Sequence, residues 1–190
     1  MTRRQLVGFA VVLGLIAAGL IVRSTGGSKE DARLPGLRRT AALAPCPAGL
    51  GRELPDVTLA CLGGGRKVSL RGGTPGRPTL VNIWGSWCGP CTAEIPDLVA
   101  FSARAGDKVG IVGVDTEDEP VLALTFAAQT RMRWPSVVDD DKVVLRAFGS
   151  GPPVTLFLDA SGHVAFTKQG QFHSVAEIEQ LVAQHLGVRL

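Results

Sequence analysis

The residues best suited to chemistry are Cys88 and Cys91, which lie three positions apart in the stretch Trp87-Cys88-Gly89-Pro90-Cys91. At the start of a helix, residues three apart occupy neighbouring turns, and their Cα atoms come within the roughly 5 to 6 Å that a disulfide requires. A cysteine at a helix N-terminus faces unpaired N–H groups and the positive end of the helix dipole, which favour the thiolate. The spacing therefore predicts a reversible disulfide with Cys88 as the nucleophile.

Thiol-disulfide exchange follows from this arrangement. We expect the Cys88 thiolate to attack a partner's disulfide, and the shielded Cys91 to attack the Cys88 sulfur and release the reduced partner. Pro90 fits the first helical turn, where its missing N–H costs little, and Gly89 leaves room for the partner chain. This chemistry needs no cofactor and no metal.

A CxxC pair can also be half of a structural zinc site, but such a site needs two more ligands. The other two cysteines, Cys46 and Cys61, are separated by fourteen residues in different surroundings. A pair of inert core cysteines is disfavoured as well, because the Gly89-Pro90 dipeptide belongs to a turn and packs poorly. The redox pair is the interpretation that the motif favours.

Cys46 and Cys61 precede the predicted core of the domain. In an oxidising compartment, two remaining cysteines close in sequence most simply form a structural disulfide. By the loop-entropy model, a loop of this size contributes roughly 3 kcal/mol to the free energy of unfolding. The alternative is a second redox pair that relays electrons.

Apolar runs indicate the elements that must position the CxxC motif. Residues 79–84 and 109–114 are continuous apolar runs, typical of parallel strands covered on both faces, and a helix over about 89–104 is predicted between them. Runs at 57–61 and 66–70 flank three glycines and predict a hairpin at the sheet edge. The CxxC motif then lies at the carboxyl end of a strand, where open α/β sheets carry their chemistry.

The rest of the chain completes an α/β fold. Helices are predicted after Pro120 and over about 141–148, and the last helix begins after Ser174 as its N-cap. Runs at 154–158 and 163–168, separated by a turn cluster, predict an antiparallel hairpin. The sequence therefore predicts a central mixed β-sheet with helices on both faces.

The amino end is typical of an export segment. Residues 6–22 form an uncharged apolar run of 17 residues, which reaches about 25 Å as a helix, enough for a thin membrane. Arg3 and Arg4 precede this run, as in secretory signals, and no suitable cleavage motif follows it. We expect one N-terminal transmembrane helix, an uncleaved signal-anchor over 1–23; a cleaved signal and a buried core helix are the alternatives.

The segments after the apolar run differ in composition. Residues 24–44 are rich in glycine and charge and are predicted to be a flexible tether, followed by a single domain over 45–190. The net charge is +3, and no dense Lys/Arg tract interleaved with aromatics occurs, which argues against nucleic-acid binding. We expect a single-pass protein of the cell membrane with its catalytic domain outside the cytoplasm.

Together, the strand and the CxxC motif resemble the thioredoxin superfamily, and within it the membrane-tethered TlpA/ResA-like branch of extracytoplasmic thiol-disulfide oxidoreductases. Residues 79–91, TLVNIWGSWCGPC, carry the resemblance, which extends over about 50–187. It implies a thioredoxin-like fold, with Cys88 and Cys91 as the redox pair and Trp87 among the residues that dock the partner.

The resemblance also implies a role for Glu94, which matches the active-site glutamate of the ResA-like branch. An acid near Cys91 could take its proton during resolution. Cytoplasmic thioredoxins have an aspartate six residues before the first cysteine, whereas Asn82 stands there in this chain and cannot exchange a proton. The alternative for Glu94 is an exposed glutamate near the helix start, favoured by the dipole.

Pro153 matches the family's cis-proline, on the strand that faces the CxxC motif. The resemblance implies a cis bond between Pro152 and Pro153, which would offer the preceding backbone to an extended partner segment. This sequence departs from the family in having Pro152, which removes one backbone donor from the docking surface.

The leading interpretation is an enzyme that reduces disulfides of exported proteins. The resemblance implies a place in cytochrome c maturation and a thiol-type electron donor in the membrane. A disulfide oxidase is the second interpretation, since the reduction potential decides the direction of electron flow. A non-catalytic binding module with a thioredoxin fold is the third, although the presence of both cysteines argues against it.

Overall fold

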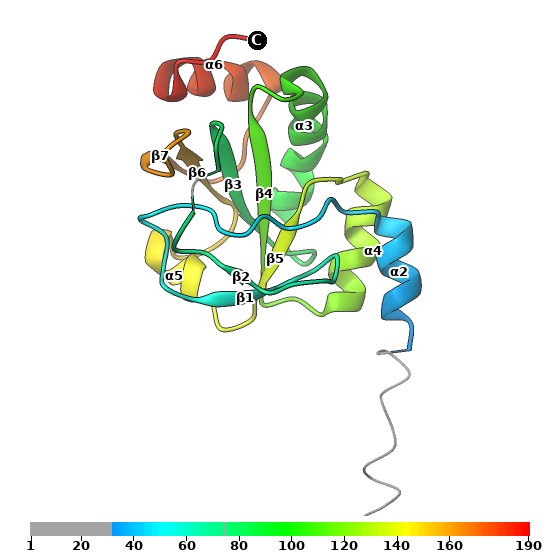
Figure 1. Ribbon diagram of the computed structural model, residues 1–190. Coiled ribbons are helices and arrows are strands. Elements are labelled where there is room, and N and C mark those ends of the chain that lie inside the picture. Colours follow the sequence, from blue (N-terminus) through cyan, green and yellow to red (C-terminus); the bar gives the residue numbers. More distant parts are fainter. Residues whose placement is uncertain (1–31, 74) are drawn as a thin grey trace, which may run out of the picture. The chain divides into compact units, whose positions relative to one another are not determined.

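A mixed β-sheet forms the centre of the protein in the computed structural model, which describes residues 32–73 and 75–190 (Figure 1). Its seven strands lie in the order β2-β1-β5-β4-β3-β6-β7. The central strands are parallel to one another: β3 (Thr79–Trp84), β4 (Gly110–Thr116) and β5 (Ser136–Asp139). The outer strands are antiparallel to their inner neighbours: β1 (Thr58–Cys61), β2 (Val68–Ser69), β6 (Val154–Leu158) and β7 (Val164–Gln169).

Helices connect and flank the strands. They are α2 (Leu34–Ala41), α3 (Gly89–Ala105), α4 (Pro120–Thr130), α5 (Val143–Phe148) and α6 (Val175–Leu186). α3 leads from β3 to β4, and α4 leads from β4 to β5, as parallel neighbours require. Ser174 caps α6 and accepts a hydrogen bond from the Glu177 N–H at 3.2 Å. The predicted α/β fold and both predicted hairpins are confirmed.

The two faces of β3 meet different elements, because successive residues of a strand point to opposite sides. Asn82 reaches Glu94 on α3, and the indole of Trp84 stacks on an aromatic ring of α4 with 5.4 Å between centroids. Val81 and Ile83 instead pack into a core on the other face, together with α5 and the segment before β1. Every residue of β3 is buried, which explains its continuous apolar run.

The chain before the sheet contains α2, so the prediction of a flexible tether over 24–44 is wrong for its second half. The Arg38 guanidinium donates to the Leu62 carbonyl at 3.2 Å, and the Arg133 guanidinium donates to the carbonyl of the buried Ala41 at 3.0 Å. These contacts hold the end of α2 against the domain. Composition suggested a solvated linker because the partners of α2 lie far along the chain.

The predicted signal-anchor and the first part of the predicted tether lie outside the described residues. None of the helices in the described part of the chain combines the length and the hydrophobicity that a membrane span requires.

Candidate active site

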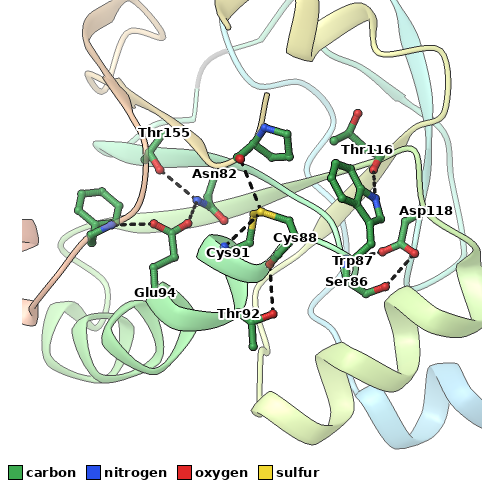
Figure 2. The surroundings of a disulfide bond; sticks show 12 residues. Asn82, Ser86, Trp87, Cys88, Cys91, Thr92, Glu94, Thr116, Asp118 and Thr155 are labelled. Atoms are coloured by element: carbon green, nitrogen blue, oxygen red, sulfur yellow. Dashed lines mark hydrogen bonds between the residues drawn. A yellow bond between two sulfur atoms is a disulfide. The ribbon is translucent and has the colours of Figure 1, made fainter. Parts of the chain in front are cut away.

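The Cys88–Cys91 disulfide lies where β3 gives way to α3, at the carboxyl end of the central strands (Figure 2). Cys88 is the N-cap of α3, and its Sγ accepts a hydrogen bond from the Cys91 N–H at 3.2 Å. The Cα atoms are 5.2 Å apart. Cys88 is 4% exposed and Cys91 is completely buried, so an approaching sulfur meets Cys88 first.

Hydrogen bonds fix the loop that carries Cys88. The Asp118 carboxylate accepts from the backbone N–H and from the hydroxyl of Ser86, and the indole N–H of Trp87 donates to the Thr116 carbonyl at 3.2 Å (Figure 2). Despite this anchor, Trp87 is 54% exposed. A large aromatic surface therefore borders the redox pair.

The loop before β6 lies against Cys88. The peptide bond between Pro152 and Pro153 is cis, as predicted, and the Pro152 carbonyl oxygen lies 3.5 Å from Cys88 Sγ. The pairing of Ile83 with Val154 brings these distant segments together, because β6 begins where β3 ends. In the reduced protein this carbonyl can accept a hydrogen bond from the Cys88 thiol.

Glu94 is fully buried on α3, three residues after Cys91 and therefore on the same side of the helix. Its Oε1 accepts from Asn82 Nδ2 at 2.8 Å, and its Oε2 accepts from the Phe172 N–H at 2.9 Å. Asn82 Nδ2 also donates to the Thr155 hydroxyl at 3.0 Å (Figure 2). The alternative of an exposed glutamate at the helix start is wrong, because the segment before α6 covers this carboxyl.

Burial raises the pKa of Glu94 to about 7, since the ionised carboxylate is poorly solvated there. Hydrogen bonds from Phe172 and Asn82 oppose this shift, as does the positive charge of Lys168, whereas the negative charge of Glu177 adds to it. A group with a pKa near 7 can both accept and release a proton at neutral pH.

Asp115 is a second buried acid, which the sequence reasoning missed. It lies on β4 directly opposite Trp84 of β3, near the end of the sheet that carries the redox pair. Burial, and after it the negative charge of the nearby Asp118, raise the pKa of Asp115 to about 9. The carboxyl is therefore protonated at neutral pH. Its position directly after the apolar run 109–114 was the available signal.

The second cysteine pair forms a disulfide at the other side of the sheet. Cys46 and Cys61 are both 6% exposed, with Cα atoms 6.0 Å apart. Cys61 belongs to β1, which β5 and β4 separate from β3, a distance of about 14 Å across the sheet. This buried, distant position favours the structural role over the electron relay. Within residues 32–73 and 75–190, no cluster of His, Cys, Asp or Glu side chains is arranged to hold a metal ion.

Comparison with known proteins agrees with this geometry. The family model described as Redoxin matches residues 50–182. The chain belongs to the Redoxin family. The match includes β3, the CxxC motif, the Pro153 strand and most of α6.

Two relatives and one solved structure refine the assignment. Thiol-disulfide oxidoreductase ResA of Bacillus thuringiensis (strain Al Hakam) is 27% identical to this chain over 117 residues. The aligned residues cover 60% of this chain and 66% of the relative, so the chain spans just under two thirds of the relative's length. A thiol:disulfide interchange protein DsbE homolog of Paracoccus denitrificans (strain Pd 1222) is 35% identical over 127 residues, 65% of this chain and 68% of the relative. A thioredoxin family thiol:disulfide interchange protein from Chlorobium tepidum TLS shares the fold, with a TM-score of 0.59 at 24% identity over 76% of this chain and all of that one. The chain is thus one of the ResA/DsbE-like thiol-disulfide oxidoreductases, on a thioredoxin-like fold.

Proposed function

We propose that this enzyme reduces disulfides of exported proteins. The observation that carries the proposal is the placement of Cys88 at the N-terminus of α3 with the buried Cys91 and Glu94 behind it. Cys88, the less buried cysteine and the one at the helix N-terminus, is the attacking group, and the completely buried Cys91, three residues before the titrating Glu94, is the resolving one.

Two exchanges complete the reaction. The Cys88 thiolate attacks one sulfur of the substrate disulfide, that bond breaks, and the second substrate sulfur leaves as a thiolate that takes a proton from water. Glu94 then accepts the Cys91 proton, and the resulting thiolate attacks Cys88 Sγ. The Cys88–Cys91 disulfide forms and the first substrate sulfur is released, so that two electrons have passed to the substrate.

The surroundings of Cys88 support a protein substrate. Trp87 offers an exposed aromatic surface, and the Pro152 carbonyl lies within 3.5 Å of Cys88 Sγ. An extended segment carrying a cysteine could be held between them by backbone and aromatic contacts. We include cytochrome c maturation in the proposal, because haem is attached to CxxCH segments whose cysteines must first be reduced.

The proposed location is the outer side of the cell membrane, with residues 6–22 as the anchor. The signal-like amino end and the structural Cys46–Cys61 disulfide support an oxidising compartment outside the cytoplasm. There, a thiol-type donor in the membrane would return the Cys88–Cys91 disulfide to the dithiol after each cycle. A C-terminal alkaline phosphatase fusion, which is active only outside the cytoplasm, tests the location.

The reduction potential of the Cys88/Cys91 pair tests the direction. We expect a value near or below that of glutaredoxins, about −200 to −230 mV, together with reduction of insulin and of a disulfide-bonded CxxCH peptide. A value close to about −120 mV would instead make the protein an oxidase. In the reduced protein, iodoacetamide should modify Cys88 well before Cys91; equal rates would remove the assignment of roles.

A further inference from the structure

Lys168 binds the segment between β7 and α6, residues 170–174, through its ammonium group. The Lys168 ammonium donates to the Gln171 carbonyl at 2.7 Å and to the Gly170 carbonyl at 3.3 Å. It lies 5.1 Å from the centroid of the Phe172 ring and 3.4 Å from Glu177 Oε1. The Lys168 side chain is only 14% exposed, so water screens its charge less than that of an ordinary surface lysine.

A single peptide group connects this lysine to the active site. The carbonyl of the peptide between Gln171 and Phe172 accepts from Lys168, and the N–H of the same peptide donates to Glu94 Oε2 at 2.9 Å. Phe172 is buried. The carbonyl and the N–H of a peptide group belong to one planar, conjugated unit, and hydrogen bonds in series polarise one another. Withdrawal of electron density at the carbonyl makes the N–H a stronger donor to the carboxylate.

We propose that Lys168 is a positioning residue that acts on Glu94 through the Gln171–Phe172 peptide and sets how strongly this carboxyl holds a proton. The inference rests on the proposed role of Glu94 as acceptor of the Cys91 proton. Lys168 then keeps a sufficient fraction of the Glu94 carboxyl ionised to accept the Cys91 proton at neutral pH.

The other groups around Glu94 do not replace this contribution. Asn82 donates to it from β3 but carries no charge. Glu177 on α6 acts in the opposite sense, because its negative charge raises the pKa of Glu94, and one of its oxygens is occupied by the His173 N–H at 2.7 Å. On α3 itself, Cys91 lies three residues before Glu94 and belongs to the disulfide, and Asp97 lies three residues after it. As a second acid, Asp97 cannot lower the pKa of Glu94. Lys168 is the cation whose charge lowers the pKa of Glu94.

The test is a carbon-13 NMR titration of the Glu94 carboxyl in the oxidised protein, where neither active-site thiol can titrate. Lys168→Met keeps the aliphatic stem over Phe172 and removes the charge, so the Glu94 pKa should rise by roughly half a unit or more. Lys168→Arg should leave it close to the parent value. Lys67→Met is the matched control, because Lys67 is exposed beside β2 at the opposite edge of the sheet, and it should change nothing.

An unchanged Glu94 pKa in Lys168→Met overturns the inference, and so does an equal rise in Lys168→Met and Lys168→Arg. If Lys168→Met fails to fold, Lys168→Gln replaces it with the same expected rise. The pH profile of the resolution step then separates this inference from the proposed function. A Glu94 pKa that moves while the profile stays fixed upholds the action of Lys168 and removes Glu94 from the reaction.

Discussion

Glu94→Gln removes the titrating proton at the buried end of the active site and keeps the shape of the side chain. The glutamine oxygen can still accept from the Phe172 N–H. Its NH₂ group would then face Asn82, whose Oδ1 has no hydrogen-bond partner among the described residues. Rotation of the Asn82 amide presents that oxygen to the new donor. We therefore expect the variant to fold and to bind substrate normally.

The pKa of Glu94 gives the size of the effect on catalysis. With a pKa of about 7, about a tenth of this carboxyl is ionised at pH 6, about half at pH 7 and about nine tenths at pH 8. The resolution rate of the parent enzyme should follow this fraction. A positioned general base contributes about 10² to 10⁴ in rate, so Glu94→Gln should slow resolution at pH 8 by roughly a hundredfold and abolish the midpoint near pH 7.

Stopped-flow absorbance with an aromatic disulfide such as Ellman's reagent separates the two exchanges. Attack by Cys88 releases one thiolate and leaves a mixed disulfide, and attack by Cys91 releases the second. Glu94→Gln should leave the first phase intact and slow only the second. Glu179→Gln is the control, since this acid pairs with Arg104 on the protein surface. A second phase with the parent rate and pH midpoint would leave Glu94 a structural acid, with water as the proton acceptor.

Glu94→Gln should also change how the free energy of unfolding depends on pH, in a direction that follows from the pKa of Glu94. The pKa of Glu94 rises from 4.5 to about 7 on folding, so the folded protein binds more protons than the unfolded chain between these values. The contribution of Glu94 to the stability of the parent therefore falls as pH rises from 4.5 through 7, by about 3 kcal/mol in total. Denaturant unfolding of oxidised Glu94→Gln should show a smaller decline over this range. Parallel declines in both proteins would contradict the burial of an ionisable group.

Three further predictions follow from the other acids and cysteines. Asp115→Asn should stabilise the protein in denaturant unfolding by roughly 2–4 kcal/mol at pH 7 and by nothing at pH 4. At pH 7 the folded Asp115 carboxyl must hold a proton that the unfolded chain releases, whereas asparagine has no such proton. An equal effect at both pH values would refute this. Cys91→Ser should accumulate mixed disulfides between Cys88 and exported proteins on non-reducing gels, and a failure to trap any would argue against protein substrates. The Cys46–Cys61 disulfide should survive mild thiol that opens the active-site disulfide, as measured by mass spectrometry of differentially labelled cysteines; opening of both pairs at one potential would favour the relay.

The sequence predicted the elements that carry an unmistakable pattern. β3 and β4 are buried on both faces and read as continuous apolar runs, and the CxxC motif marked the junction between strand and helix. The cis bond before Pro153 followed from the resemblance, since no local property distinguishes it from any other pair of prolines.

The remaining features depend on contacts across the chain. The position of Glu94 on α3 does not reveal that the Phe172 segment, 78 residues later, buries it. Lys168 resembles an ordinary edge-strand lysine until its partner carbonyls are known. The charged residues of α2 suggested a linker because the carbonyl of Leu62 and the side chain of Arg133 are not visible as partners in a local window.

The two edge strands of the sheet, β2 and β7, decide how readily the protein pairs with a foreign strand. An enzyme that meets incompletely folded chains risks pairing its outermost strands with theirs. β2 is only two residues long, and it offers almost no backbone to a foreign strand. At the opposite edge, the Glu53 carboxylate accepts from the Val164 N–H at 3.0 Å and from His163 at 2.7 Å, which occupies the beginning of β7. β2 is therefore a poor template for strand addition, and the first backbone donor of β7 is already occupied.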